Sequence, residues 1–256
     1  MSNADDYNDD ATSRALVDRY YADPARRQSV MRDLFNRSAR YYNLVNLVAS
    51  LGSGAWYRRF CLRRAGVRPG ALVVDVATGT GLLAHAALSL TKDRSSVIGL
   101  DVSEAMLAIA QRTLGIALIQ ATAEALPLAP GIADFVTMGY ALRHVSDLKM
   151  AFGEAMRVLR PGGRMVLLEM SAPRNKFARA MASGFIGSVV PLLSLLMARD
   201  RRARVLMQYH WQTILNYMPP DVIMRVMQDS GFKNVTCKSY IDLFHHYTGE
   251  KPSSEA

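Results

Sequence analysis

A glycine-rich loop that follows an apolar run is the sharpest chemical signal in this 256-residue chain. The loop runs from Asp75 through Gly79 to Gly81 and reads Asp-Val-Ala-Thr-Gly-Thr-Gly. Glycine lets the backbone turn tightly from a strand into a helix and lie against a ligand with no side chain in between. Asp101 ends the next apolar run, where its carboxylate can accept hydrogen bonds from both hydroxyls of a ribose. The pattern therefore predicts a site for a ribose-containing cofactor.

Two classes of cofactor fit this loop. With Ala84, the spacing matches the Gly-x-Gly-x-x-Ala form of a dinucleotide fingerprint, so an NAD-dependent oxidoreductase is one hypothesis. Against it, Asp75 lies in the strand before the loop. A carboxylate there repels a pyrophosphate but suits a cationic amino group or a sulfonium.

The loop must be held by a sheet, because apolar runs alternate with helical stretches along the chain. The run 71–76 is apolar on both faces, as a buried parallel strand should be. Ser103 is expected to cap a helix whose first turn carries Glu104. The order strand, helix, strand predicts a doubly wound α/β fold with a mostly parallel seven-stranded sheet and helices on both faces. The expected strands are 71–76, 97–101, 116–121, 133–138, 164–170, 234–239 and 241–247, and the expected helices between them are 82–90, 105–114, 147–159 and 221–230.

Two further helical regions are expected around this sheet. Residues 14–66 are predicted to form N-terminal helices, and residues 172–218 a helical insertion that covers the open end of the sheet as a lid. Residues 1–13 are polar and are expected to be disordered. Residues 14–256 then form a single domain.

The stretch 185–197 is unusually apolar, and arginines follow it at Arg199, Arg201, Arg202 and Arg204. No apolar run in the sequence reaches the roughly 18–20 residues that a membrane-spanning helix needs. One hypothesis is a lid that shelters a hydrophobic acceptor and touches an anionic membrane surface through its arginines. The alternatives are a buried helix pair and the interface of a homodimer.

Composition narrows the class of protein further. The formal charge is +9, almost all from arginine, but no basic patch interleaved with aromatic residues accompanies it, so nucleic-acid binding is not expected. Cys61 and Cys237 are far apart and have no ligand-like neighbours, which predicts reduced thiols and no metal site. The first ten residues lack the features of a secretory signal. A cytoplasmic protein is expected. The apolar stretch 185–197 suggests as an alternative that the protein is associated with the inner face of the membrane.

Several motifs occur together in one order and carry a family resemblance. Four of them resemble the class I S-adenosylmethionine-dependent methyltransferases: Asp75–Gly81, Leu100-Asp101, Ala123–Pro127 and Arg157–Gly163. Further matches narrow the resemblance to the ubiquinone/menaquinone-biosynthesis C-methyltransferases (UbiE-type): Phe35, Ala39–Asn43, Asn46, Trp56–Arg59, Ala141–Val145 and Leu168–Ser171. These enzymes have a Rossmann-like fold, in agreement with the order of the predicted elements.

The resemblance implies roles for particular residues. The cofactor-binding set that it implies is Asp75, Ala77, Gly79, Thr80, Gly81, Asp101, Val102, Thr122, Ala123 and Gly139. Within this set, the loop glycines would line the methionine part of S-adenosylmethionine, Asp101 would hold the ribose, and Thr122 and Ala123 would flank the adenine. Tyr42 and Tyr140 would belong to the wall of the substrate pocket.

The implied activity is C-methylation of a lipophilic quinol or a related aromatic acceptor. Removing the O–H proton of a phenol makes the ortho carbon nucleophilic, so the site needs a base with a pKa near neutrality and a cation for the phenolate. His144 is the candidate base and Arg143 the candidate phenolate stabiliser. The alternatives are a packing role for His144 and an ion pair between Arg143 and Glu169. For His245 and His246 a structural role is expected.

The sequence departs from the family pattern at four places. Leu82 replaces an acidic residue, Thr122 replaces Asn or Asp, His144 replaces Asn, and the closing segment 243–249 differs. These positions bear on the acceptor more than on the cofactor. Two other hypotheses therefore remain: a methyltransferase for another lipid or a specialised metabolite, acting on oxygen or carbon, and a non-catalytic cofactor-binding module.

Overall fold

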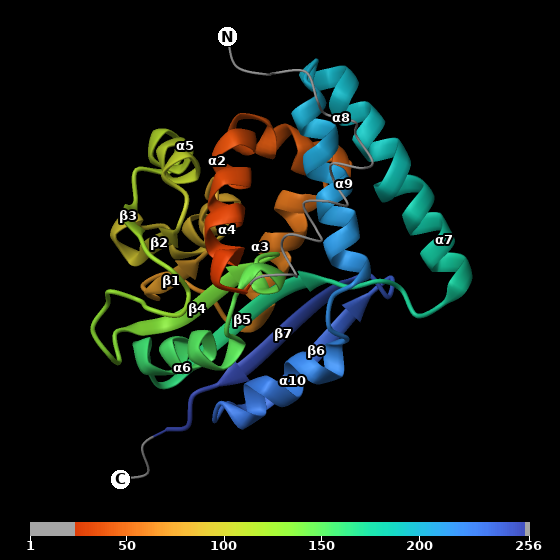
Figure 1. Ribbon diagram of the computed structural model, residues 1–256. Coiled ribbons are helices and arrows are strands. Elements are labelled where there is room, and N and C mark those ends of the chain that lie inside the picture. Colours follow the sequence, from red (N-terminus) through yellow and green to blue (C-terminus); the bar gives the residue numbers. More distant parts are fainter. Residues whose placement is uncertain (1–23, 254–256) are drawn as a thin grey trace.

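Seven strands form one sheet in the order β3-β2-β1-β4-β5-β7-β6, in a computed structural model that describes residues 24–253 (Figure 1). Strands β1 to β5 pair in parallel, and β6 and β7 add an antiparallel hairpin next to β5. The strands are β1 Val73–Val76, β2 Val97–Asp101, β3 Ala117–Gln120, β4 Ala133–Gly139, β5 Leu159–Met170, β6 Lys233–Tyr240 and β7 Phe244–Glu250. The predicted doubly wound, mostly parallel sheet is confirmed. The expected disorder of residues 1–13 lies outside the described residues.

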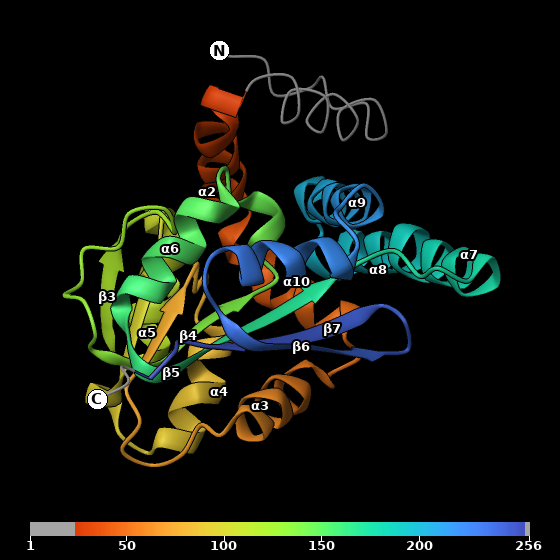
Figure 2. The ribbon, with the colours of Figure 1, turned by 90° about the horizontal axis from the view of Figure 1, so that it is seen from below.

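Helices cover both faces of the sheet because alternate strand residues point to opposite sides. Val73 and Val166 face a core made with α3, α4 and α5, whereas Val74 and Leu167 face a core made with α6 and α10. Figure 2 shows the sheet between these two layers. The helices are α3 Gly54–Ala65, α4 Leu82–Thr91, α5 Glu104–Leu114, α6 Leu148–Val158 and α10 Pro220–Asp229, with short 3-10 turns at η1 Arg94–Ser96 and η2 Leu142–His144.

Side-chain caps fix where two of these helices begin. The Ser103 hydroxyl accepts a hydrogen bond from the Met106 amide at 3.2 Å, as the sequence predicted. The Asp147 carboxylate likewise accepts one from the Met150 amide at 3.0 Å. Both helices follow the carboxyl end of a strand, so these caps determine where the loops around the site leave the sheet.

The starts of β5 and β7 differ most from the predicted strand starts. The last strand begins at Phe244 rather than at 241, because Ile241 and Asp242 form a turn with left-handed φ angles of 48° and 53°. Strand β5 begins at Leu159, the last residue of the helix expected over 147–159, and not at 164. Its pairing with β4 is irregular there, since the register shifts between Ala133 and Phe135. Pro161, Gly162 and Gly163 are thus part of a bulged strand end.

A separate helical layer lies above the sheet in Figure 1. It consists of α2 Pro24–Ala49, α7 Lys176–Gly184, the π-helical turn η3 Phe185–Val189, α8 Val190–Ala198 and α9 Arg201–Leu215. These helices share a third apolar core, in which Val45 of α2 meets Val190 of α8 and Trp211 of α9. The helices expected between 172 and 218 are thus present and pack on the N-terminal helix.

The helices α7, η3 and α8 form one continuous stretch, Lys176–Ala198, of 23 residues, and its most apolar window has a mean hydropathy of 1.9. By length and composition it could cross a membrane, and only 22 % of its most apolar window is buried. The expectation that no apolar segment reaches that length is therefore wrong, because α7 extends the apolar run 185–197 on its N-terminal side. Core helices of soluble proteins reach similar values, so this finding assigns no membrane span.

Candidate active site

The loop after β1 is anchored by Asp75, whose side chain is fully buried. Its carboxylate accepts hydrogen bonds from the hydroxyls of Thr78 at 2.7 Å and Thr137 at 2.6 Å. Burial raises the pKa of Asp75 to about 6, although both hydroxyl contacts oppose the shift. Through these two hydrogen bonds, Asp75 joins the loop residue Thr78 to Thr137 of β4.

The two loop glycines meet different surroundings. A Cβ on Gly79, which has φ of 58°, would meet no atom within 4 Å, so this residue faces open space. A Cβ on Gly81, with φ of 85°, would overlap the Leu114 side chain of α5. Gly79 thus leaves room for a ligand, whereas Gly81 permits α4 to pack closely on α5.

A pocket of about 100 Å³ lies in front of this loop, at the carboxyl ends of β1, β2 and β4. Asp101 lines it, and its carboxylate accepts hydrogen bonds from the amides of Gly79 and Ser103, each at 2.8 Å. These contacts leave lone pairs on both carboxylate oxygens that a ribose diol can use. The residues lining the pocket are Phe35, Tyr42, Ala77, Gly79, Asp101, Val102, Met106, Ala121, Thr122, Ala123, Glu124, Gly139, Tyr140, Ala141, His144 and Val145.

Most of the residues predicted to bind the cofactor come together in this pocket. Those that line it are Ala77, Gly79, Asp101, Val102, Thr122, Ala123 and Gly139. Asp75, Thr80 and Gly81 are not among the lining residues. The Thr80 hydroxyl instead donates to Asn43 of α2 at 2.5 Å, which joins the loop to the helical layer. The prediction did not include Phe35 and Met106, whose apolar side chains carry no cofactor signal in the sequence.

A larger cavity of about 330 Å³ lies next to the first pocket, and Tyr42 and Tyr140 line both. The two tyrosines predicted for the substrate pocket therefore stand where the two spaces meet. Tyr140 has a left-handed φ of 58°, a strained backbone of the kind that clusters at functional sites. The cavity is mostly apolar, and its lining residues are Tyr42, Val45, Asn46, Ala49, Ser50, Ser53, Gly54, Trp56, Tyr57, Arg58, Phe60, Tyr140, Arg143, Met170, Ile186, Met207, His210, Ile214, Tyr240, Ile241 and Phe244.

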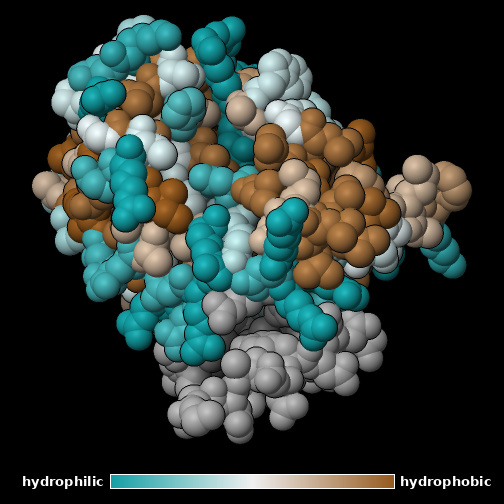
Figure 3. Space-filling view, turned by 90° about the horizontal axis from the view of Figure 1, so that it is seen from above, coloured by the Kyte–Doolittle hydropathy of each residue, from teal (hydrophilic) through white to brown (hydrophobic). Residues whose placement is uncertain are grey.

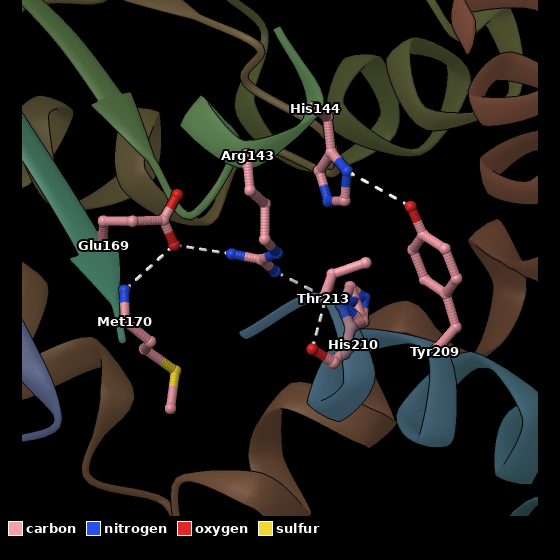
Figure 4. Close-up of polar contacts among 7 residues, drawn as sticks. All are labelled: Arg143, His144, Glu169, Met170, Tyr209, His210 and Thr213. Atoms are coloured by element: carbon pink, nitrogen blue, oxygen red, sulfur yellow. Dashed lines mark hydrogen bonds and ion pairs between the residues drawn. The ribbon is translucent and has the colours of Figure 1, made fainter. Parts of the chain in front are cut away.

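Arg143 lies at the wall of the larger cavity and pairs with Glu169 (Figure 4). The Nη1–Oε1 distance is 2.5 Å, and both side chains are almost fully buried. The Glu169 carboxylate also accepts a hydrogen bond from the Met170 amide at 2.9 Å. The ion pair that the sequence suggested as an alternative is present, and it holds a guanidinium at the cavity wall.

On its other side, Arg143 Nη2 lies 3.4 Å from Nδ1 of His210, a residue of α9. A guanidinium only donates hydrogen bonds, so Nδ1 must accept and the proton of the neutral ring lies on Nε2. Burial, with the Arg143 charge as the second cause, lowers the pKa of His210 to about 3. His210 is therefore neutral at physiological pH and lines the cavity as a hydrogen-bond donor.

His144 lines the smaller pocket, not the larger cavity. Its ring is packed edge-on against Phe35 and stacked on Tyr209, whose hydroxyl lies 3.4 Å from Nδ1. Burial and the nearby charge of Arg143 hold the pKa of His144 well below its ordinary value. The near-neutral pKa expected of a base at this position is therefore not found.

The histidines of β7 have different surroundings. The His245 ring lies 2.7 Å from the Ser171 hydroxyl and 2.8 Å from the Ser239 hydroxyl, and both histidines are buried. These contacts suit the structural role expected for His245, and for His246 that role stays a prediction. Among residues 24–253, no group of three or more potential metal ligands comes together.

The chain matches the model of the ubiE/COQ5 methyltransferase family over residues 24–244. It belongs to that family. A curated relative, the ubiquinone/menaquinone biosynthesis C-methyltransferase UbiE of Shewanella frigidimarina, is 29 % identical over 224 residues, which cover 85 % of this chain and 88 % of the relative. The protein of the same name from Shewanella sediminis is 30 % identical over 216 residues, covering 82 % and 85 %. The resemblance found in the motifs is thereby confirmed.

Solved structures support the fold. A methyltransferase from Thermotoga maritima superposes with a TM-score of 0.60 at 22 % identity, covering 86 % of this chain and 99 % of that one. One from Mesorhizobium loti superposes with a TM-score of 0.51 at 19 % identity, covering 73 % and 94 %. Both are described as dependent on S-adenosylmethionine. The chain is an S-adenosylmethionine-dependent methyltransferase, and the oxidoreductase hypothesis is discarded.

The smaller pocket fits this cofactor. Asp101 offers acceptors for the ribose, Gly79 leaves open space above the loop, and Ala121 and Ala123 give apolar contact suited to a base. The larger cavity adjoins this pocket at Tyr42 and Tyr140. His210 is a further site residue that the sequence did not reveal, because it belongs to none of the motifs and lies 67 residues from Arg143.

Proposed function

We propose that this methyltransferase transfers the methyl group to a ring carbon of a lipophilic quinol or a related aromatic acceptor. The observation that carries the proposal is the larger cavity: it is mostly apolar, has a guanidinium at its wall, and meets the cofactor pocket at Tyr42 and Tyr140. Arg58 lines the same cavity. A prenylated hydroquinone matches this arrangement, with an apolar tail and two oxygens. The names of the UbiE relatives point to the same class of substrate.

The chemistry required of the chain is modest. S-adenosylmethionine, held by Asp101 and the loop at Gly79, would supply an electrophilic methyl group. The acceptor gives up its phenolic proton to water, and the Arg143 guanidinium stabilises the phenolate that forms. The Nε2–H of His210 donates a second hydrogen bond to that oxygen. The chain would hold the ionised ring with its ortho carbon toward the junction of the two spaces, where that carbon would accept the methyl group, and the ring proton that methylation displaces would leave to solvent.

The oxidation state of the acceptor tests this proposal. A quinol provides the phenolate that Arg143 can stabilise, whereas the matching quinone has no O–H group and an electron-poor ring. We expect turnover with the quinol under anaerobic reducing conditions. With the quinone we expect turnover at least about 100-fold lower, because loss of one hydrogen bond to a charged oxygen in the transition state lowers kcat by about that factor. Equal rates with both forms would contradict the mechanism.

The pH dependence of turnover follows from the two buried histidines. Burial lowers the pKa of His144 well below its ordinary value and that of His210 to about 3, so both rings are neutral at physiological pH. We expect kcat to rise with pH as the acceptor ionises, since free phenols have a pKa of about 10. Asp75, whose pKa burial raises to about 6, can add a step that His144→Ala leaves in place. An inflection near 6.5 that disappears in His144→Ala would instead identify His144 as a titrating base.

We also propose that the helical lid contacts an anionic membrane surface. Its exposed apolar side chains gather on one side of the molecule in Figure 3: Phe177, Met181, Val189, Leu192, Leu193, Leu196 and Met197. Residues 171–199 contain basic side chains but no Asp or Glu, which suits an anionic surface. Flotation with anionic vesicles at low salt tests this contact. A homodimer through the same surface is the competing prediction, and light scattering in the absence of lipid detects it.

A further inference from the structure

Three exposed apolar residues surround the mouth of the acceptor cavity. Trp56 and Ile241 line the cavity, yet their side chains are 68 % and 78 % exposed, so they must stand where it opens to solvent. Leu51 is 75 % exposed and lies between Ser50 and Ser53, which also line the cavity. We call Leu51, Trp56 and Ile241 the apolar rim.

The backbone of the rim gives a second indication. Leu51 and Ile241 both have a left-handed φ of 48°, a conformation that favours glycine or asparagine. An isoleucine there is strained because its side chain branches at Cβ. Leu51 and Ile241 are therefore unfavourable in two ways: their side chains do not suit a left-handed backbone, and these apolar side chains are exposed to water. Neither turn geometry nor core packing explains these apolar side chains.

The charge around the rim favours an anionic partner. The segment 43–74 contains five arginines and no aspartate or glutamate. Three of them, Arg59, Arg63 and Arg64, are exposed on α3, the helix that carries Trp56. Arg59 follows Trp56 by three residues, about one helical turn, so the cation and the indole lie near one another along the helix. Arginines beside exposed tryptophan are typical of proteins that bind the headgroup region of a bilayer.

The rim also continues toward the helical lid. The backbone amide of Arg174 donates to the Asp242 carboxylate at 2.7 Å, which places the start of the lid beside the turn that carries Ile241. Phe177, three residues further along the chain, is 74 % exposed. The apolar surface of the lid and the mouth of the cavity are thus joined at this point.

We propose that the apolar rim inserts into the interface of an anionic phospholipid bilayer, so that the acceptor enters the cavity directly from the membrane. Trp56 stacks on Phe60 with ring centroids 5.3 Å apart, and this aromatic pair would lie at the level of the headgroups. An acceptor tail could then remain in the bilayer while the ring reaches Arg143. This inference rests on the proposed lipophilic acceptor for its purpose, but insertion of the rim is measurable without any acceptor.

The first test uses tryptophan fluorescence. The chain has two tryptophans, Trp56 at the rim and the buried Trp211, so Trp211→Phe leaves Trp56 as the single reporter. With vesicles of phosphatidylglycerol and brominated phosphatidylcholine, we expect a blue shift and quenching of Trp56 that high salt reverses. Trp56→Phe, which retains Trp211, should show neither change. An unquenched Trp56 on vesicles that carry the protein would overturn the proposal, as would quenching of Trp211 alone.

The second test separates loading from chemistry. Leu51→Asn suits the left-handed backbone and does not alter a residue that lines the cavity. We expect it to lower vesicle partitioning about tenfold, the factor for loss of one buried leucine side chain, and to raise KM for a bilayer-embedded acceptor while a short-tailed soluble acceptor turns over normally. Met150→Asn, which changes an exposed apolar residue of α6 in the same way, is the matched control and should change neither quantity.

Three results would contradict the proposal or reassign the surface. Equal effects of Leu51→Asn and Met150→Asn would show that the rim has no special role. If Leu51→Asn also lost turnover on the soluble acceptor, the substitution would act on the active site and not on entry of the acceptor from the membrane. Self-association that Leu51→Asn abolishes, without vesicle binding, would assign the rim to a second copy of the chain. Failure to methylate any quinol would refute the proposed function alone, because the quenching result does not depend on an acceptor.

Discussion

Arg143→Ala is expected to lower turnover by about 10²–10³-fold, since it removes the cation that stabilises the developing phenolate. It should also lower the free energy of unfolding by about 3–5 kcal/mol, because it leaves the Glu169 carboxylate buried without its partner. Steady-state kinetics with a quinol acceptor measures the first effect and chemical denaturation the second. Affinity for S-adenosylhomocysteine should change little, because Arg143 does not line the cofactor pocket.

A double variant separates these two effects. In Arg143→Met with Glu169→Gln, no charge is buried and the glutamine can still accept the hydrogen bond from the Met170 amide. We expect most of the lost stability to return, because replacing both members of a buried pair costs far less than removing one. Turnover should stay low. Recovery of turnover together with stability would show that Arg143 acts only through the fold.

Asp101→Ala is expected to weaken S-adenosylhomocysteine binding at least about 100-fold. Two hydrogen bonds from the ribose to a carboxylate are at stake, each worth about 1.5–3 kcal/mol. The variant also removes the acceptor for the Gly79 amide, so the loop loses its support on the side of β2. Isothermal titration calorimetry on the purified chain measures the change.

Asp101→Asn is the matched control for this variant. The amide keeps one oxygen that can accept from the Gly79 or Ser103 amide, but it cannot serve two ribose hydroxyls equally well. We expect an intermediate affinity and an unliganded melting temperature close to that of the wild-type chain. Wild-type affinity in both variants would remove Asp101 from the ribose site and reassign the pocket.

The sheet and the cofactor pocket were largely predictable because they depend on local signals. A buried apolar run, a glycine loop and an aspartate at the end of the next run have one consistent arrangement in a parallel sheet. Parallel order then brings the ends of β1, β2 and β4 to one edge without further information. Asp101, Gly79 and Gly139 accordingly line one pocket.

The acceptor cavity was less predictable because it is built between layers. His210 reaches Arg143 only when α9 packs over the sheet, and neither the spacing nor the type of this residue indicates that contact. The pKa of His144 likewise depends on burial among Phe35, Tyr209 and His210, which a single sequence does not reveal. The sequence identified the correct pair, Arg143 and Glu169, because both residues lie in or beside recognisable motifs.

The turn before β7 was missed for a related reason. Ile241 is β-branched, and its apolar type indicates a strand. In the fold it takes a left-handed turn position at the mouth of the cavity. Local propensity and structure disagree at this residue, and such disagreement is concentrated where a side chain serves a function other than folding.

The product of the reaction tests the central claim most directly. The chain would be incubated with S-adenosylmethionine that carries a ¹³C-labelled methyl group and with a prenylated hydroquinone kept reduced, and the lipid extract would be examined by NMR. The account predicts a new aryl C–CH₃ signal, on the carbon ortho to a phenolic oxygen. A labelled O–CH₃ signal, or no transfer by a chain that binds S-adenosylhomocysteine normally, would contradict C-methylation of a quinol.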